Sequence, residues 1–101
     1  YFLEIVNKKD ILFGLLRLRI SNKIAMVREL HIYGQALNLG EVGKESQHRG
    51  LGKMLMHKAE EITKKNKCKE IKVISGIGVR KYYKKLGYKL DKEGIYMVKN
   101  L

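Results

Sequence analysis

The hydrophobic period of the chain first changes near residue 50, and this change limits its fold more than any other feature. Before it, apolar and polar residues alternate, most clearly from Leu16 to Ile20, and a period of two residues is typical of strands. After it, apolar residues recur at the spacing of one helix face. These residues are Leu51, Leu55, Ala59 and Ile62. We therefore expect a sheet begun by the first third of the chain and an amphipathic helix packed on it.

The first third predicts three strands, Phe2 to Val6, Ile11 to Ile20 and Ile24 to Tyr33. The turns between them are short and polar, with lengths that suit antiparallel hairpins. The period lapses from Gly34 to Gln47, and this stretch is predicted to be a loop with one short strand from Ala36 to Leu39.

The rest of the chain predicts helices and strands in alternation. The long helix begins around Leu51 and runs for about four turns. A strand from Glu70 to Ser75, a second helix from Val79 to Leu86 and a last strand from Ile95 to Lys99 follow. Gly87 ends the second helix, because glycine is preferred just past the last helical position. The expected fold is α+β in the order βββ-loop-α-β-α-β, a mostly antiparallel sheet with helices packed on it.

Length and composition indicate one domain over residues 1–101. A chain of 101 residues has room for one core, and 45% apolar with 32% charged residues indicates a soluble surface. No run approaches the roughly 20 apolar residues of a membrane span, so we expect no membrane partner and a cytoplasmic location. Because the chain lacks an initiator Met, we also expect it to be the carboxy-terminal fragment of a larger protein.

Net charge and cysteine content narrow the chemistry. Lysine and arginine number 22 against 10 aspartate and glutamate residues, a net charge of +12. This charge favours a nucleic acid or a phosphate-bearing cofactor, although a lysine-rich genome or a hot habitat gives the same composition. Cys68 is the only cysteine, which excludes an internal disulfide and a zinc or iron-sulfur site within this chain. We expect Cys68 to be a packed small residue and expect no metal site.

The segment from Gln47 to Lys53, with the sequence QHRGLGK, is the sharpest local signal, and we place it at the start of the long helix. A helix start carries unpaired amides and the positive end of the helix dipole, and glycines let a phosphate approach the backbone. The spacing matches neither the nucleoside-triphosphate loop nor the dinucleotide fingerprint. The competing explanation is that Gly50 and Gly52 only allow another element to pack closely on the helix.

This segment resembles the Gln-x-x-Gly-x-Gly signature with which GNAT acetyltransferases bind the pyrophosphate of acetyl-CoA, and the element order resembles their fold. More narrowly, four segments in the right order are similar to the catalytic subunit of Elongator, a family of tRNA-modifying enzymes. They are residues 28–34, 47–50, 73–88 and 96–99. The resemblance implies an acetyl-CoA-dependent acyltransferase of the tRNA uridine carboxymethyltransferase family.

The resemblance also implies partners and co-substrates. Members of that family bind and hydrolyse acetyl-CoA to carboxymethylate the wobble uridine of tRNA. They carry a radical-SAM domain, with an iron-sulfur cluster and S-adenosylmethionine, ahead of the acyltransferase domain, and this chain lacks the cysteines of that cluster. The implied partners are tRNA and the radical-SAM domain of the same polypeptide, with a homodimer left open.

By position, the resemblance assigns acetyl-CoA contacts to the third strand, to the start of the long helix and to the second helix. The residues are Glu29, Leu30, His31, Ile32, Gln47, His48, Arg49, Gly50, Leu51, Gly52, Lys53 and Tyr83. Extended backbone in the third strand can offer amide and carbonyl groups to the pantetheine arm, as an added strand would use them.

Tyr83 and Tyr82 are the catalytic candidates. Neighbouring positions of a helix point about 100° apart, so one ring can face the cofactor while the other packs in the core. We assign Tyr83 to the cofactor side, where GNAT enzymes place a phenol that protonates the departing thiolate, and we favour the core for Tyr82. Imidazole titrates near neutral pH, but His31 and His48 are expected to be structural or cofactor-contacting. Glu29 would act as a base only if its side chain faces the acceptor.

Two other functions fit parts of the sequence. A GNAT N-acetyltransferase acting on protein lysine, of the histone type, is disfavoured because an acidic groove would suit its substrate and the net charge is +12. A non-catalytic basic tRNA-binding module would bind tRNA with a steep salt dependence but gain no stability from acetyl-CoA. The candidate phosphate contacts with tRNA are Arg17, Arg19, Lys81, Lys84 and Lys85.

Overall fold

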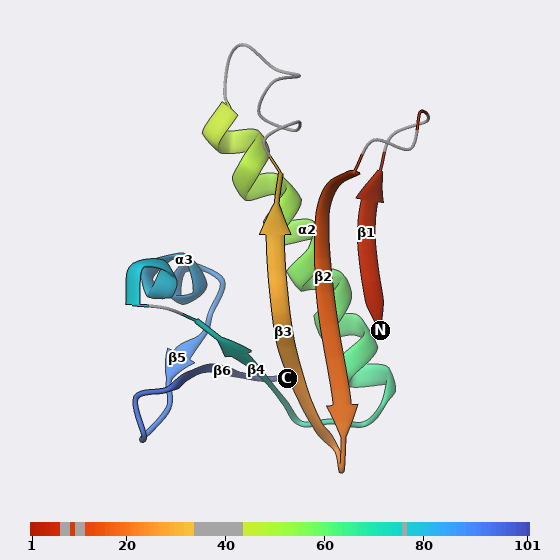
Figure 1. The fold of residues 1–101 in the computed structure, drawn as a ribbon. Coiled ribbons are helices and arrows are strands. Elements are labelled where there is room, and N and C mark those ends of the chain that lie inside the picture. The colour runs from red at the N-terminus through yellow and green to blue at the C-terminus, as the bar shows by residue number, and fades with distance from the viewer. Residues whose placement is uncertain (7–8, 10–11, 34–43, 76) are drawn as a thin grey trace.

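The computed structural model describes residues 1–6, 9, 12–33, 44–75 and 77–101, and the side chains of residues 12, 44–49 and 77 lie outside that description. Figure 1 shows a sheet whose strands fan out in two directions, with the long helix crossing one face. The short strand expected from Ala36 to Leu39 lies outside the described residues.

Three antiparallel strands open the sheet: β1 (Phe2–Val6), β2 (Leu12–Ser21) and β3 (Ile24–Ile32). They agree within one residue with the expected strands. A two-residue hairpin joins β2 to β3. Its corner residues, Asn22 and Lys23, have φ of 51° and 63°, the left-handed values that a type I′ turn needs at both positions.

The helix α2 (Lys44–Lys65) crosses the face of the sheet formed by β1, β2 and β3. Its buried residues recur at helical spacing and are Gly52, Leu55, Met56, Ala59 and Thr63. The Thr63 hydroxyl donates to the carbonyl oxygen of Ala59 at 2.8 Å, so this buried polar side chain is satisfied.

The expected start of this helix was wrong. The sequence placed it near Leu51, whereas α2 has 22 residues and begins at Lys44. Glycine in a helix interior costs about 1 kcal/mol relative to alanine, which is why Gly50 and Gly52 suggested a boundary. The apolar face that the helix buries against the sheet outweighs that cost.

The strand β4 (Glu70–Ile74) runs parallel to β3. A 3-10 turn, η1 (Ile77–Val79), leads into α3 (Arg80–Lys85), and the strands β5 (Lys89–Leu90) and β6 (Tyr96–Asn100) follow. The described strands form one sheet in the order β1-β2-β3-β4-β6-β5. The expected α+β fold with a mostly antiparallel sheet is thus confirmed. The sequence missed β5, because two residues carry no hydrophobic period.

The helix α3 ends as expected at Gly87, which has φ of 97°. The amides of Gly87 and Tyr88 donate to the carbonyls of Lys84 and Tyr83 at 3.1 and 3.0 Å, the Schellman pattern that requires a left-handed residue. The Tyr88 hydroxyl then donates to the carboxylate of Glu60 at 2.7 Å. This bond ties the end of α3 to α2.

The hydrophobic core lies between α2 and the sheet and continues under α3. Its most deeply buried members include Leu16, Val27, Met56, Ile71 and Met97. Cys68 is 4% exposed and belongs to this cluster, which confirms it as a packed residue. Of the helices in the described ranges, none has the length and apolar character to cross a membrane.

Candidate functional site

The strands β3 and β4 pair along only part of their length. Their parallel register runs from Ala25 beside Ile71 to Val27 beside Val73 and ends there. Beyond this point β3 continues to Ile32, while β4 turns away toward α3 (Figure 1). Within the described residues, the last part of β3 therefore has no strand beside it on the β4 side. We call residues 28–32 the open edge.

A β-bulge lies where β3 leaves β4. In the register with β2, the partner of Arg17 is Glu29 and the partner of the next β2 residue is Val27. Arg28 is therefore an extra residue without a counterpart. A bulge bends its strand and increases the local twist, which accounts for the departure of the open edge from β4.

Two residues of the open edge, Leu30 and Ile32, direct their backbone groups away from β2. The amide of Tyr33 donates to the carbonyl of Phe13 at 2.9 Å, so these two residues form a hydrogen-bonded pair. In an antiparallel ladder such pairs alternate with pairs whose groups point outward. In this register His31 is hydrogen-bonded to β2, whereas the amides and carbonyls of Leu30 and Ile32 point away from β2. An extended ligand that carries amides can add there as a strand does.

The side chains of Glu29 and His31 lie on the sheet face opposite α2. The Glu29 carboxylate pairs with Arg17 at 3.3 Å, and its other oxygen lies 3.8 Å from Nε2 of His31. These three side chains are between 40% and 57% exposed. Leu30 and Ile32 instead pack against the core. The predicted contact segment thus contains two residues with free backbone and two with exposed side chains.

The structure places the segment 47–53 in the first turns of α2, and the side chains of residues 47–49 lie outside its description. An amide in a helix bonds to the carbonyl four residues earlier, so the amide of Gly50 is used within α2. The unpaired amides belong to residues nearer Lys44. The expectation that Gly50 and Gly52 stand at the helix start was therefore wrong.

Gly50 and Lys53 share one exposed face of α2, because positions three apart are neighbours on a helix. Lys53 is also two turns from Glu60, which bonds to Tyr88 at the end of α3. Lys53 therefore lies on the side of α2 that faces α3. A Cβ added at Gly50 would meet no described atom within 4 Å, so the backbone is accessible at that point.

Gly52 lies at the contact between α2 and α3. A Cβ on Gly52 would overlap the hydroxyl oxygen of Tyr82, so the close approach of Tyr82 requires glycine at this position. Close packing thus accounts for Gly52. Gly50 has no such structural explanation among the described residues and is the glycine left accessible to a ligand.

The two tyrosines of α3 differ in depth. Tyr83 is 6% exposed and belongs to the core, with its ring centroid 5.2 Å from that of Tyr82 and 5.9 Å from that of Tyr88. Burial, and then the nearby Tyr82 phenol, raise the pKa of Tyr83 to about 12. Burial also raises the pKa of Tyr82. The sequence favoured the core for Tyr82, but Tyr83 is the more buried of the two.

Three buried polar atoms around the end of β4 and the start of α3 have no hydrogen-bond partner in the described part of the chain: Ser75 Oγ, Arg80 Nε and Tyr82 Oη. Buried polar groups in folded proteins are nearly always bonded, so these atoms are candidates for bonds to a ligand or to water. Sequence reasoning missed Ser75 and Arg80. The serine and glycines that directly follow β4 were the signal that could have identified Ser75.

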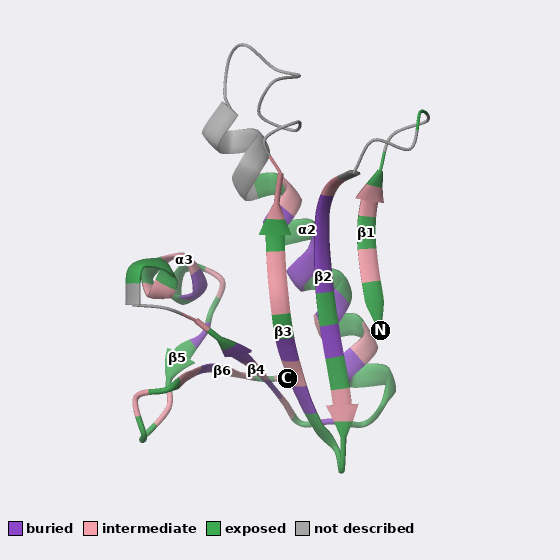
Figure 2. Cartoon of the chain, viewed as in Figure 1, coloured by how far each residue is buried: buried purple, intermediate pink, exposed green. Residues whose placement is uncertain are grey.

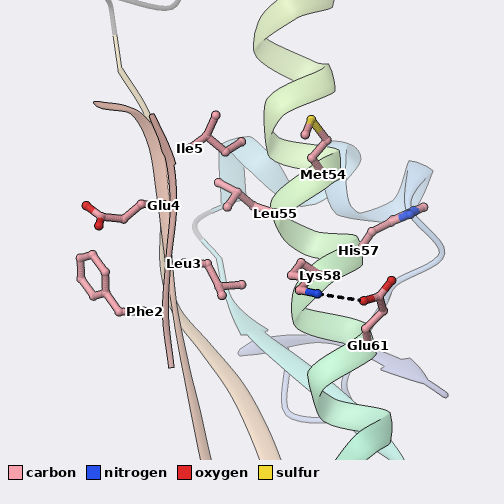
Figure 3. Close-up of a pocket in the computed structure, with 9 residues that line it drawn as sticks. All are labelled: Phe2, Leu3, Glu4, Ile5, Met54, Leu55, His57, Lys58 and Glu61. Carbon is pink, nitrogen blue, oxygen red and sulfur yellow. Dashed lines mark hydrogen bonds and ion pairs between the residues drawn. The ribbon is translucent and has the colours of Figure 1, made fainter. Parts of the chain in front are cut away.

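A groove of about 530 Å³ lies elsewhere, between β1 and α2 (Figure 3). Leu3 and Ile5 of β1 point toward Leu55 of α2 and make its walls apolar. Lys58 and Glu61 form an ion pair of 3.3 Å on its helix side. The groove is separated from the open edge by β2, and none of the predicted site residues lines it.

The sequence of the chain is similar to those of known acetyltransferases. The acetyltransferase (GNAT) domain family matches residues 1–98. The chain is 49% identical, over 91% of its length, to Elongator complex protein 3 of Schizosaccharomyces pombe. It is 42% identical, over 99% of its length, to the tRNA uridine(34) acetyltransferase of Dehalococcoides mccartyi. The chain spans 19% and 24% of the lengths of these two proteins.

The fold is also similar to a solved structure, that of PaiA N-acetyltransferase from Thermoplasma acidophilum in complex with coenzyme A. The TM-score is 0.72, and the match covers 99% of this chain and 60% of that one. The sequence identity is 23%, so this likeness concerns the fold alone.

Proposed function

The chain belongs to the GNAT acetyltransferase domain family, and we propose that it is the acetyl-CoA-binding acyltransferase domain of a tRNA uridine-modifying enzyme. In this proposal the domain binds acetyl-CoA and hydrolyses its thioester for carboxymethylation of the wobble uridine. Because the chain spans 19% and 24% of the two relatives, the complete modification is assigned to a longer polypeptide.

The open edge is the observation that carries this proposal. Its free amides and carbonyls, on Leu30 and Ile32, suit the pantetheine arm of acetyl-CoA, which itself carries two amide groups. The hydroxyls of Ser75 and Tyr82, which have no partner among the described residues, lie on the other side of the place where β4 turns away from β3. The two sides together supply the backbone and hydroxyl groups that such an arm would bond.

We assign the diphosphate of acetyl-CoA to the first turns of α2. The positive end of a helix dipole favours an anion there, and the accessible backbone of Gly50 lets a phosphate approach. Lys53 offers an exposed ammonium on the same face. Residues 47–49 and Leu51, which the resemblance assigns to the same contact, belong to the same turns.

Tyr83 is the proposed general acid for release of the thiolate. A phenol with a pKa of about 12 stays protonated at neutral pH, so it can give a proton to the sulfur as the carbon-sulfur bond breaks. Tyr82 is the second candidate, because its buried hydroxyl has no hydrogen-bond partner in the described ranges. Glu29 and His31 receive no acid-base role, since their side chains lie on the far face of the sheet, where Glu29 contacts both Arg17 and His31.

We assign tRNA as the macromolecular partner, which the net charge of +12 supports. A radical-SAM domain with its iron-sulfur cluster and S-adenosylmethionine is proposed for the longer polypeptide, and a cytoplasmic location for the whole. A homodimer of the chain is the alternative assembly. Sedimentation of the chain over a range of concentrations tests the alternative, because a monomer throughout would remove the homodimer.

Calorimetric titration with acetyl-CoA tests the binding site. Gly50→Glu places a negative charge where the diphosphate is assigned, so we expect its affinity to fall by about tenfold or more. Lys64→Gln lowers the net charge by the same amount at the other end of α2 and is the matched control, which should keep wild-type affinity. Circular dichroism verifies that each variant is folded. A folded wild-type chain that binds no acetyl-CoA would overturn the assignment.

Thioester hydrolysis, followed as release of free thiol with and without tRNA, tests the reaction. A general acid contributes about 100-fold or more, so Tyr83→Phe is expected to lose that factor while still binding acetyl-CoA. A loss confined to Tyr82→Phe would transfer the role to Tyr82. Faster transfer to a lysine peptide than to water would favour the histone-type alternative. Binding of tRNA with a steep salt dependence, together with no increase in the stability of the chain on adding acetyl-CoA, would favour the non-catalytic module.

A further inference from the structure

A second polar surface lies on the sheet face opposite α2. Arg19 of β2 and Arg28 of β3 line a shallow pocket of about 240 Å³ near the β2–β3 hairpin. Its remaining lining residues are Ser21, Asn22, Ile24 and Met26. Figure 2 shows buried and exposed bands alternating along β2; Leu18 is buried in the core and Arg19 is exposed on the other face. The pocket therefore faces away from the core and from α2.

The arginines of this face differ in their partners. Arg17 is neutralised by Glu29 at 3.3 Å. The Arg28 guanidinium contacts the sulfur of Met26 at 3.9 Å, and in the described part of the chain neither Arg28 nor Arg19 pairs with a carboxylate. Two guanidinium charges on adjacent strands thus stand beside one pocket without a counter-ion from the described residues.

The β-bulge gives this arrangement its form. Side chains normally alternate between the faces of a sheet, but Arg28 contacts Met26 and the next residue, Glu29, pairs with Arg17. Two successive side chains therefore lie on the same face. As a result Glu29 neutralises Arg17, and Arg28 remains beside Arg19 and the pocket.

The chemistry of the pocket suits a phosphate of an RNA strand. A guanidinium binds phosphate with a planar fork of donors, and the hydroxyl of Ser21 and the amide of Asn22 add neutral donors. Ile24 is 46% exposed and, with Met26, offers an apolar floor against which a ribose or a base can rest. An acidic peptide would use the same cations but has less use for that floor.

We propose that Arg19 and Arg28 form a phosphate-binding site for the tRNA backbone on the outer face of β2 and β3, separate from the acetyl-CoA site. The inference rests on the proposed function in taking tRNA as the partner, and it replaces Arg17 with Arg28 among the expected phosphate contacts. Each guanidinium neutralises one phosphate, so both contribute to the salt dependence of tRNA binding.

The test is the affinity of the chain for tRNA, measured by fluorescence anisotropy over a series of salt concentrations. In Arg19→Gln/Arg28→Gln we expect the slope of log affinity against log salt to become shallower by about 2, with affinity lower by about tenfold or more. Lys64→Gln/Lys65→Gln removes two charges from the exposed end of α2 and is the matched control. Arg19→Lys/Arg28→Lys keeps the charge, so it should retain the slope and lose part of the affinity.

The outcomes separate this inference from the proposed function. If the arginine and lysine double variants lost the same amount of slope, tRNA binding would depend only on net charge, and the proposed site would be overturned. Equal competition for tRNA binding by polyglutamate and by RNA would overturn it as well. Wild-type chain that binds no tRNA would overturn the inference together with tRNA as partner. Acetyl-CoA titration of Arg19→Gln, the arginine that lies outside the open edge, should match wild type. If wild type fails to bind acetyl-CoA while the arginine pair still governs tRNA binding, the proposed enzyme fails and this site stands.

Discussion

The two parts of β3 differ in what surrounds them, although they belong to one continuous strand. From Ala25 to Val27 the strand lies between β2 and β4, and the side chains of Ala25 and Val27 are 0% and 1% exposed. Along the open edge, residues 28–32, β2 flanks the strand on one side, and within the described residues no strand flanks the other. The first part is paired on both sides, whereas the second has backbone groups that no described strand pairs.

In our proposal, this difference lets a single strand serve stability in one part and binding in the other. Unpaired strand edges invite unwanted pairing, and our proposal that acetyl-CoA pairs with the open edge accounts for an edge that has no strand beside it in the described part of the chain. The bulge at Arg28 separates the two parts, since it bends the strand at the residue where pairing with β4 ends.

The largest expected effect on stability comes from the part of β3 that pairs with β4, residues 25–27, and from its neighbours in β4. Ile71 lies beside Ala25 and is 0% exposed, so Ile71→Ala should lower the free energy of unfolding by about 2–5 kcal/mol. Ile32 of the open edge is only partly buried, and Ile32→Ala should cost about 1 kcal/mol. Urea unfolding measures both. Equal costs would mean that the open edge is packed as tightly as the rest and would remove the contrast.

The contact between α2 and α3 gives the next effect. Gly52→Ala brings a Cβ against the Tyr82 hydroxyl, and overpacking of this kind costs about 1–3 kcal/mol. Tyr82→Phe removes the clashing oxygen, so the double variant should recover most of the loss. Gly50→Ala is the matched control: its site is open, and alanine should raise stability by up to about 1 kcal/mol. Additive costs for Gly52→Ala and Tyr82→Phe would refute the contact.

Hydrogen exchange tests the open edge directly. Acetyl-CoA should slow exchange of the Leu30 and Ile32 amides by about tenfold or more, because these amides lack a partner in β2 and would gain one from the ligand. The amides of Glu29 and His31 already bond to β2 and should change little. Nuclear magnetic resonance resolves the four signals. Protection spread evenly over all four would argue for general tightening of the strand instead of ligand pairing.

Much of the fold could be predicted from the sequence because hydrophobic period reports burial. Along β2, burial alternates from Leu16 to Arg19 as polarity does, and Gly87 marked the end of α3. The membership of the GNAT family that the sequence motifs implied is also confirmed. The start of α2 was missed because glycine propensity is weak compared with tertiary packing.

The site was less predictable, because it depends on contacts between distant residues. Local sequence does not distinguish Gly50 from Gly52, and only the approach of Tyr82 from α3 does. The relative depth of Tyr82 and Tyr83 depends in the same way on how α3 lies against the core. The open edge arises from a bulge and from the end of pairing with β4, neither of which leaves a periodic signal. The roles in acetyl-CoA binding and catalysis stay predictions.

The last expected effect is confined to alkaline pH, and it tests whether Tyr83 is buried in the folded chain. An unfolded tyrosine ionises near pH 10, while burial raises the pKa of Tyr83 to about 12. The folded state therefore keeps its proton where the unfolded state loses it, so this contribution is complete below pH 10 and is lost as pH rises from 10 to 12. Tyr83→Phe should make the alkaline decline of stability shallower, measured by urea unfolding at several pH values.

Tyr88 provides the control for that measurement. Burial, and then its hydrogen bond to Glu60, raise the pKa of Tyr88 as well, so part of the alkaline decline should survive in Tyr83→Phe and fall further in Tyr83→Phe/Tyr88→Phe. Ultraviolet absorbance of the phenolate follows ionisation directly. If Tyr83 ionised near pH 10 in the folded chain, its hydroxyl would be in contact with water. The tyrosine would then face the cofactor side of α3, as the sequence analysis expected, and not the core.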